Sequence, residues 1–184
     1  GRYDGKKIIP LSYSSDRAWG LTPRNKEQRM AFELLMDESI NLVTLSGGAG
    51  TGKSILSVAV ALQKVIEQNI YDKLILVKPV VSAGDPIGFL PGTENEKLKP
   101  FMESFGDAIE NLMTEKNKKK RAEKKGEKPV FSVENFLAQY RDAGIIETKT
   151  FAFMRGITLS NSMVIIDEAQ EMTPHLAKLM LTRA

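Results

Sequence analysis

Apolar residues recur at three- and four-residue spacing in several stretches of the chain, the pattern of helices with one buried face. Two of these stretches are preceded by threonine and proline, Thr22-Pro23 and Thr173-Pro174, a pair typical of a helix N-cap followed by the first helical position. The helices predicted in this way are residues 22–37, 53–68, 94–115 and 133–140, with a last one opening at Thr173.

Between these helices lie short segments whose apolar residues run continuously or alternate with polar ones, as in strands. The predicted strands are residues 41–45, 73–77, 146–154 and 163–166. The last is continuously apolar, which favours a central position in the sheet. Residues 80–92 are rich in Gly and Pro and predict a long loop. Strands alternating with helices indicate an α/β fold with a parallel sheet.

A glycine-rich motif separates the predicted strand 41–45 from the helix 53–68. It fits the phosphate-loop pattern of glycine, four residues and Gly-Lys-Ser, and consists of Gly47, Gly48, Ala49, Gly50, Thr51, Gly52, Lys53 and Ser54. Glycines let successive backbone N–H groups face phosphate oxygens, and the helix that starts there adds the positive end of its dipole. We expect Lys53 to reach the β- and γ-phosphates and the Ser54 hydroxyl to ligate Mg²⁺. The alternative is a glycine-rich turn without a ligand.

An acidic pair, Asp167 and Glu168, follows the apolar strand 163–166. Ligands bind at the carboxyl ends of strands in parallel sheets, so Asp167 is a candidate partner of Ser54 in holding Mg²⁺ through water. Glu168 is a candidate to orient or deprotonate the water that attacks the γ-phosphate. A pair of adjacent carboxylates favours hydrolysis over phosphoryl transfer to another substrate.

Gln28 lies on the helix that precedes the phosphate loop. A glutamine amide can donate to and accept from the N6/N7 edge of adenine, which would select ATP over GTP. The alternative is an exposed helical glutamine.

Composition excludes several classes of site. The 184 residues suit one domain; there is no cysteine, and His175 is the only histidine. Disulfides, thiolate metal sites, cysteine nucleophiles and multi-histidine zinc sites are therefore excluded. No apolar run of about 18 residues predicts a membrane span, and the N-terminus lacks a signal-peptide pattern, so we expect a cytoplasmic protein. The chain does not begin with methionine, which suggests a fragment or a processed product.

The net charge of +3 is unevenly distributed. Residues 116–128 contain eight basic and two acidic side chains, a net +6, so the rest of the chain is acidic. Such a segment either attracts the phosphate backbone of a nucleic acid or is a solvent-exposed insertion that only keeps the protein soluble.

Together these motifs resemble the PhoH family of phosphate-starvation-inducible ATPases, a RecA-like branch of the P-loop NTPases. The resemblance covers residues 21–183. Besides the phosphate loop, Gln28 and the acidic pair, it depends on Pro23-Arg24-Asn25, Lys78-Pro79-Val80-Val81, Gly88-Phe89-Leu90-Pro91-Gly92, Arg155-Gly156 and Thr173-Pro174-His175. It implies a three-layer fold with helices flanking the parallel sheet, ATP and Mg²⁺ as cofactors, activity on RNA that includes unwinding, and a homo-oligomer in the form of a hexameric ring.

The resemblance is greatest to the subgroup whose members carry an N-terminal PIN-type ribonuclease domain. The acidic metal ligands of that domain have no counterpart here, so ribonuclease activity is not carried over. Lys78 stands where the family more often has arginine, and Ile157 interrupts the usual Arg-Gly-Arg. The family's sensor strand and its arginine-bearing neighbour would follow residue 184. We therefore expect an N-terminal extension or linker over residues 1–20 and an ATPase domain over 21–184 that lacks its C-terminal strands.

Lys78 and Arg155 are predicted at the carboxyl ends of strands, together with the loop 80–92. In related helicases that edge meets the nucleic acid, so both are candidate contacts for single-stranded RNA. The alternative is that Arg155 pairs with a carboxylate and that the glycines of the loop only shape a turn. His175 is interpreted as a helix-start residue.

Three functions are compatible with these residues. The first is a Mg²⁺-dependent ATPase coupled to RNA binding or unwinding, in which Lys53, Asp167 and Glu168 are the catalytic residues. The second is a fragment that binds nucleotide or RNA without turnover. An arginine finger contributes roughly 10³- to 10⁵-fold to the rate of hydrolysis, and we expect any such residue to follow residue 184. The third is a phosphate-loop small-molecule kinase, for which residues 116–128 are the only candidate lid.

Overall fold

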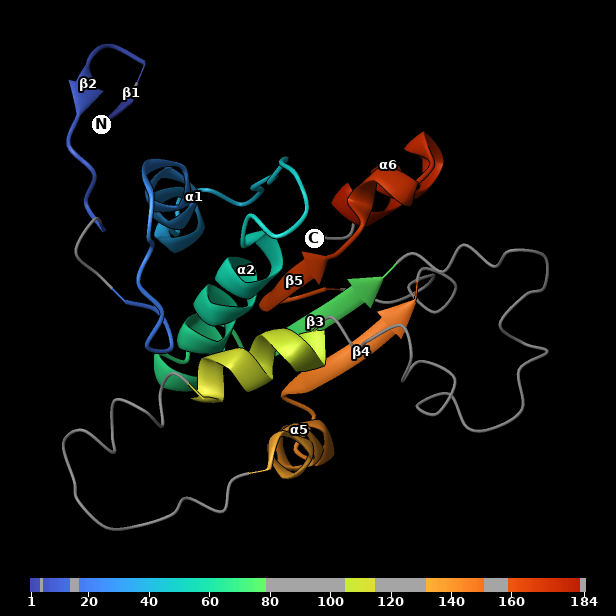
Figure 1. The fold of residues 1–184 in the computed structure, drawn as a ribbon. Helices are drawn as coiled ribbons and strands as arrows, with labels where there is room; N and C mark the ends of the chain where they lie inside the picture. The colour runs from blue at the N-terminus through green and yellow to red at the C-terminus, as the bar shows by residue number, and fades with distance from the viewer. Residues whose placement is uncertain (4, 14–16, 79–104, 115–131, 151–158, 183–184) are drawn as a thin grey trace, which may run out of the picture. The chain divides into compact units, whose positions relative to one another are not determined.

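The computed structural model describes residues 1–3, 5–13, 17–78, 105–114, 132–150 and 159–182 (Figure 1). The chain divides into two compact units. The first comprises Gly1–Gln63 and Ala108–Pro129, and the second Lys64–Asp107 and Val130–Ala184. The loop 80–92 and the basic segment 116–128 lie outside the described residues.

The first unit opens with a short antiparallel hairpin of β1 (Arg2–Tyr3) and β2 (Ile8–Ile9), followed by helix α1 (Lys26–Met36). The helix was predicted from residue 22, but its N-cap is Asn25, whose side chain accepts a hydrogen bond from the Gln28 N–H. An asparagine three residues into the predicted helix can satisfy the same unpaired donors as threonine, so the helix begins there.

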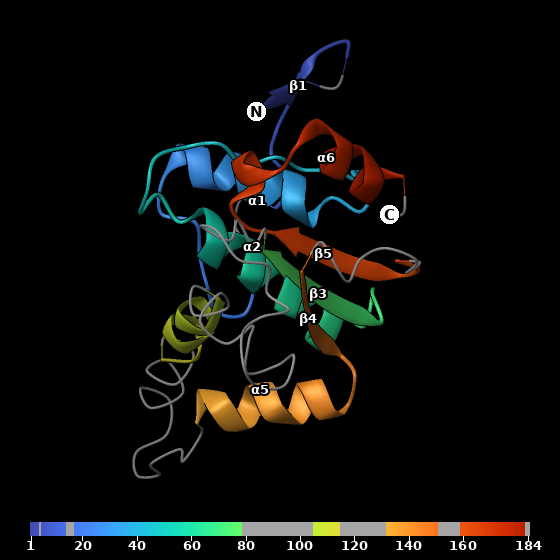
Figure 2. The same ribbon diagram turned by 90° about the vertical axis from the view of Figure 1, so that its right-hand side faces the viewer.

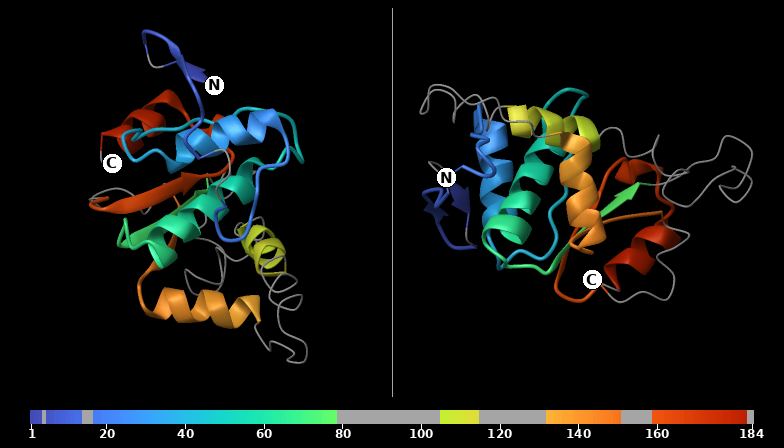
Figure 3. Two further views of the ribbon diagram at one scale, coloured as in Figure 1. Left: turned by 90° about the vertical axis from the view of Figure 1, so that its left-hand side faces the viewer. Right: turned by 90° about the horizontal axis from the view of Figure 1, so that it is seen from below.

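Helix α2 (Lys53–Leu62) begins directly after Gly52, and the helical path continues as a π-helical turn, η1 (Gln63–Glu67). This extent confirms the helix predicted over 53–68. Figure 3 shows α2 lying beside α1. The second half of α2 is fully buried from Val58 to Leu62, which explains why its sequence is apolar almost all round.

The strand predicted over residues 41–45 is wrong. No ladder includes these residues within the part of the chain that the structure describes, and Leu42 is 59% exposed. A strand requires a neighbour for its backbone N–H and C=O groups, and an apolar pattern does not reveal whether one is present. The segment instead leads into the phosphate loop as irregular backbone.

The second unit contains a parallel three-stranded sheet in the order β4-β3-β5 (Figure 1). Its strands are β3 (Lys73–Lys78), β4 (Ile146–Thr150) and β5 (Ser162–Ile166). The α/β class with a parallel sheet is confirmed. Residues 151–154 of the third predicted strand lie outside the described residues.

The central strand among these three is β3, not β5 as predicted. Residues 74–77 of β3 are all buried, whereas most of β5 is half-buried. A continuous apolar run indicates that both faces of a strand are covered, but it does not report how many strands flank it. The prediction therefore assigned the wrong strand to the centre.

Two helices flank this sheet. Figure 2 shows α6 (Pro174–Leu181) beside β5 and α5 (Val133–Asp142) beside β4. Met180 of α6 packs with Ile75, Val77 and Leu159 in a buried cluster, and Phe136 of α5 is also buried. Residues 105–114 form a further helix, which confirms the described part of the one predicted over 94–115. No helix among the described residues is long and apolar enough to cross a bilayer.

Candidate nucleotide-binding site

The phosphate loop connects irregular backbone to the first turn of α2 within the first unit. Its backbone enters the left-handed region twice, at Gly50 with φ 72° and at Gly52 with φ 91°. Side chains with a Cβ rarely adopt these angles, so glycine is strongly favoured at both positions. The Thr51 hydroxyl closes the turn by donating to the Gly48 carbonyl at 2.9 Å.

Lys53 folds over this loop. Its ammonium donates to the carbonyl oxygens of Gly47 at 2.8 Å and Gly48 at 2.9 Å. A lysine ammonium carries three N–H donors, so these contacts fix its position while its charge stays at the loop. A phosphate bound here would meet a cation that is already held in place.

Ser54 occupies the first turn of α2, next to Lys53, and is half-buried. At this position its hydroxyl lies at the end of the helix where the dipole is positive and the N–H groups have no helical partner. A hydroxyl oxygen is also the type of ligand that a hard cation accompanying the phosphates would take.

A cavity of about 520 Å³ adjoins the loop, entirely within the first unit. This volume falls within the range of small-molecule sites. Gly47 and residues 51–53 of the loop form one part of its wall, and residues 44–46 another. Its apolar residues are Ala31 and Leu34 on α1, Leu56 on α2, and Leu45 before the loop. The cavity thus combines a loop with the phosphate-loop motif and an apolar wall against which a nucleotide base could pack.

Gln28 of α1 contacts the loop itself. Its Nε2 donates to the Thr51 carbonyl at 3.0 Å, and its Oε1 accepts from the Arg24 N–H at 2.8 Å. A Cβ placed on Gly52 would lie 2.9 Å from the same Nε2, so glycine at that position also makes room for this side chain. The predicted binding residue is therefore brought to the phosphate loop.

The acidic pair lies in the second unit, after β5. The Asp167 N–H donates to the Val77 carbonyl at 3.0 Å, which extends the pairing of β5 with β3 by one residue. Glu168 adopts a left-handed conformation with φ 53°, and its carboxylate accepts a hydrogen bond from Gln170. Glu168 is exposed and Asp167 is half-buried. Both carboxylates are thus found at the carboxyl end of a parallel strand, as the sequence predicted.

Of the remaining predicted residues, the structure describes Lys78 and His175 but not Arg155. Lys78 ends β3 and is paired in register with Thr150 of β4, whereas Arg155 lies outside the described residues. His175 is exposed in the first turn of α6, and Thr173 caps that helix through the Leu176 N–H. No group of three or more His, Asp or Glu side chains suited to a metal ion occurs among the described residues.

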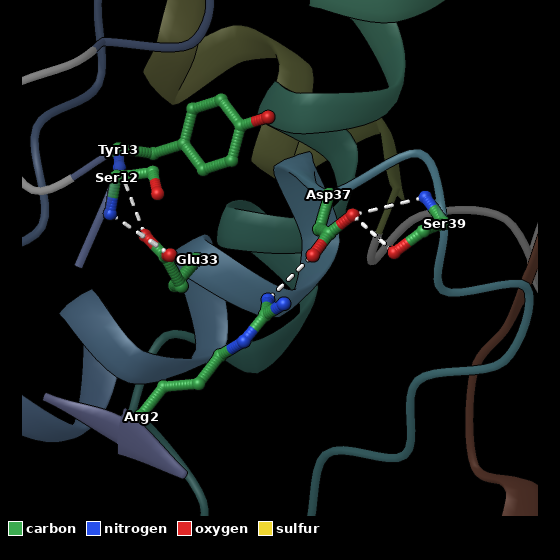
Figure 4. Close-up of polar contacts among 6 residues, drawn as sticks. All are labelled: Arg2, Ser12, Tyr13, Glu33, Asp37 and Ser39. Carbon is green, nitrogen blue, oxygen red and sulfur yellow. Dashed lines mark hydrogen bonds and ion pairs between the residues drawn. The ribbon is translucent and has the colours of Figure 1, made fainter. Parts of the chain in front are cut away.

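The sequence prediction missed an anchor on the far end of α1 (Figure 4). Glu33 is buried, and its two carboxylate oxygens accept from the backbone N–H groups of Ser12 at 2.9 Å and Tyr13 at 2.8 Å. One turn later, Asp37 pairs with Arg2 and also accepts from Ser39. The spacing of the two carboxylates is visible in the sequence, but the partners of Glu33 are backbone groups about 20 residues earlier, and Arg2 lies 35 residues before Asp37. No local pattern reveals either pairing.

The family model of the PhoH-like proteins matches residues 20–184. The chain belongs to the PhoH family. Membership places it among nucleotide-binding, ATPase-like proteins of the α/β P-loop class, as its parallel sheet and flanking helices indicate.

Three relatives illustrate the similarity. Protein PhoH2 of Bacillus subtilis is 40% identical over 179 residues, which are 97% of this chain and 37% of the relative. Protein PhoH2 of Mycolicibacterium smegmatis is 32% identical over 184 residues, which are 100% of this chain and 38% of the relative. A PhoH-like protein of Mycobacterium tuberculosis is 29% identical over 183 residues, which are 100% of this chain and 46% of the relative. The chain spans less than half the length of each of them.

Proposed function

We propose that this protein binds ATP with Mg²⁺ at the loop Gly47–Ser54 and hydrolyses it. The observation that carries the proposal is the loop itself: two glycines in the left-handed region and a lysine held over the loop carbonyls, next to a cavity of about 520 Å³. Family membership supports the same class of activity.

Each candidate residue has a separate task in this proposal. Lys53 neutralises the β- and γ-phosphates, and the backbone N–H groups at the start of α2 hold their oxygens. Ser54 and Asp167 would hold Mg²⁺, which supplies charge neutralisation on the phosphates when bound. Glu168 accepts a proton from the attacking water, which can reach its exposed carboxylate.

We further propose that hydrolysis is coupled to single-stranded RNA, in a cytoplasmic homo-oligomer. The support is the family resemblance, the position of Lys78 at the carboxyl end of β3, and the charge of +6 over residues 116–128. Arg155 remains a second candidate for RNA contact by sequence alone.

The test is inorganic phosphate release from ATP with Mg²⁺, with and without single-stranded RNA, alongside nucleotide binding by titration. RNA-stimulated release is the expected result. Release that does not respond to RNA would remove the RNA coupling, and absence of nucleotide binding would overturn the whole proposal. Phosphate transferred to an added acceptor instead of released would favour the kinase alternative.

A further inference from the structure

The Gln28 side chain makes hydrogen bonds within the protein that recognition of a nucleotide base would not require. One end of its amide is bonded to the Arg24 N–H, and the other to the Thr51 carbonyl inside the phosphate loop. The Asn25 side chain also caps the Gln28 N–H, so the residue is held through its backbone as well as its amide. The side chain is therefore a crosslink between the start of α1 and the loop.

The helix that carries Gln28 is itself firmly placed. Phe32 and Met36 are buried on one face of α1, and the buried Glu33 carboxylate holds two backbone N–H groups of the N-terminal segment (Figure 4). Charge-assisted hydrogen bonds of this kind are stronger than neutral ones. A fixed helix gives the Gln28 amide a fixed position from which to hold the loop.

The Thr51 carbonyl is a sensitive point of the loop. Thr51 precedes Gly52, whose left-handed backbone sets the direction of the first N–H groups of α2. Rotation of the peptide between them would turn the Thr51 carbonyl and redirect the Gly52 N–H, which belongs to the phosphate-binding backbone. The hydrogen bond from Gln28 opposes that rotation.

We propose that Gln28 is a positioning residue of the phosphate loop, which it holds in the binding conformation through the Thr51 carbonyl. The inference builds on the proposed binding of nucleotide at this loop. It makes Gln28 important for the phosphates, whatever base they carry. The amide retains one N–H and one lone pair beyond these bonds, so contact with adenine would be additional.

Tripolyphosphate separates the two roles because it has the phosphates of ATP and no base. The experiment measures the affinities of ATP, GTP and tripolyphosphate, with Mg²⁺, for the wild-type chain and for Gln28→Ala and Gln28→Met. Methionine keeps the length of the side chain and its helix propensity but makes neither hydrogen bond. Gln139→Ala, an exposed glutamine on α5, is the matched control.

Both Gln28 variants are expected to bind tripolyphosphate about 2- to 12-fold more weakly, the loss that corresponds to one hydrogen bond. ATP and GTP should weaken by at least the same factor, with unchanged thermal unfolding for Gln28→Met and no change for Gln139→Ala. Tripolyphosphate affinity that stays at the wild-type value while ATP affinity falls would overturn the inference and leave Gln28 as a reader of the base alone. If the wild-type chain bound none of the three ligands, that result would overturn the proposed nucleotide binding itself, and with it the role of Gln28.

Discussion

The phosphate loop and the acidic end of β5 reach their geometry by different means. The loop is held by hydrogen bonds within itself, from Thr51 and Lys53 to Gly47 and Gly48, with one crosslink from Gln28. The position of Asp167 depends on the pairing of β5 with β3, and the position of Glu168 depends in addition on its own left-handed backbone conformation. The loop therefore has most of its geometry encoded locally, whereas the carboxylates inherit theirs from a sheet. Substitutions in the two regions should separate binding from turnover.

The largest effect is expected where the loop loses its cation. Lys53→Ala should weaken ATP binding about 10- to 100-fold, because a charged hydrogen bond contributes roughly 1.5–3 kcal/mol, and phosphate release should be lost with it. Isothermal titration with a slowly hydrolysed ATP analogue measures the first effect. Lys178→Ala, an exposed lysine on α6, is the control and should change neither quantity. Wild-type affinity in Lys53→Ala would exclude the loop as the phosphate site.

The acidic end of β5 should behave in the opposite way. Glu168→Gln is expected to lower phosphate release by roughly 10²- to 10⁴-fold, the contribution of a general base, with ATP affinity unchanged. Steady-state phosphate release and titration, run on the same preparation, measure both quantities. The control is Glu171→Gln, an exposed glutamate in the same turn. Equal turnover in the two variants would exclude Glu168 as the general base.

The third prediction concerns the buried carboxylate that ties α1, the helix carrying Gln28, to the N-terminal segment. Glu33→Gln keeps the shape of the side chain but directs an NH₂ group at one of two backbone N–H donors. We expect a loss of roughly 2–3 kcal/mol in the free energy of unfolding, because a buried charged acceptor is removed. Urea denaturation gives this value, and the exposed Glu38→Gln should match the wild type. An unchanged midpoint in Glu33→Gln would mean that the N-terminal segment does not depend on this anchor.

The smallest effect concerns Asp37 at the other end of the same anchor. Hydrogen bonds from Ser39 and Arg2 lower the pKa of Asp37 from 3.8 to about 2. A carboxylate with a lowered pKa in the folded state adds stability above its unfolded pKa, and that stability is lost as the pH falls toward 2. Asp37→Asn should therefore lose part of the stability at neutral pH and show a weaker decline in melting temperature between pH 4 and 2. Asp142→Asn, on the exposed end of α5, should retain the wild-type decline.

Much of this molecule could be predicted from local patterns. The helical spacing located α2, α5 and α6, apolar runs located β3 and β5, and alternation with polar residues located β4. The phosphate loop, too, is recognisable, because its chemistry restricts which residue types can occupy it. These predictions succeeded where a residue's role depends on neighbours a few positions away in the chain.

The two errors in the strands both involve a partner that is distant in sequence. Residues 41–45 have the pattern of a strand and no ladder in the described structure, and β3 is more central than the apolar β5. Periodicity reports which side chains avoid water, but it does not report which backbone lies alongside.

The sequence by itself therefore determined the class of fold, the identity of the phosphate loop and the presence of an acidic pair after a strand. Only the tertiary structure decided that Gln28 holds the Thr51 carbonyl and that Glu33 holds the N–H groups of Ser12 and Tyr13. The physical reason is that both partners are backbone groups. Every residue except proline carries the same N–H and every residue the same C=O, so no pattern of side chains can mark which of them will be bound.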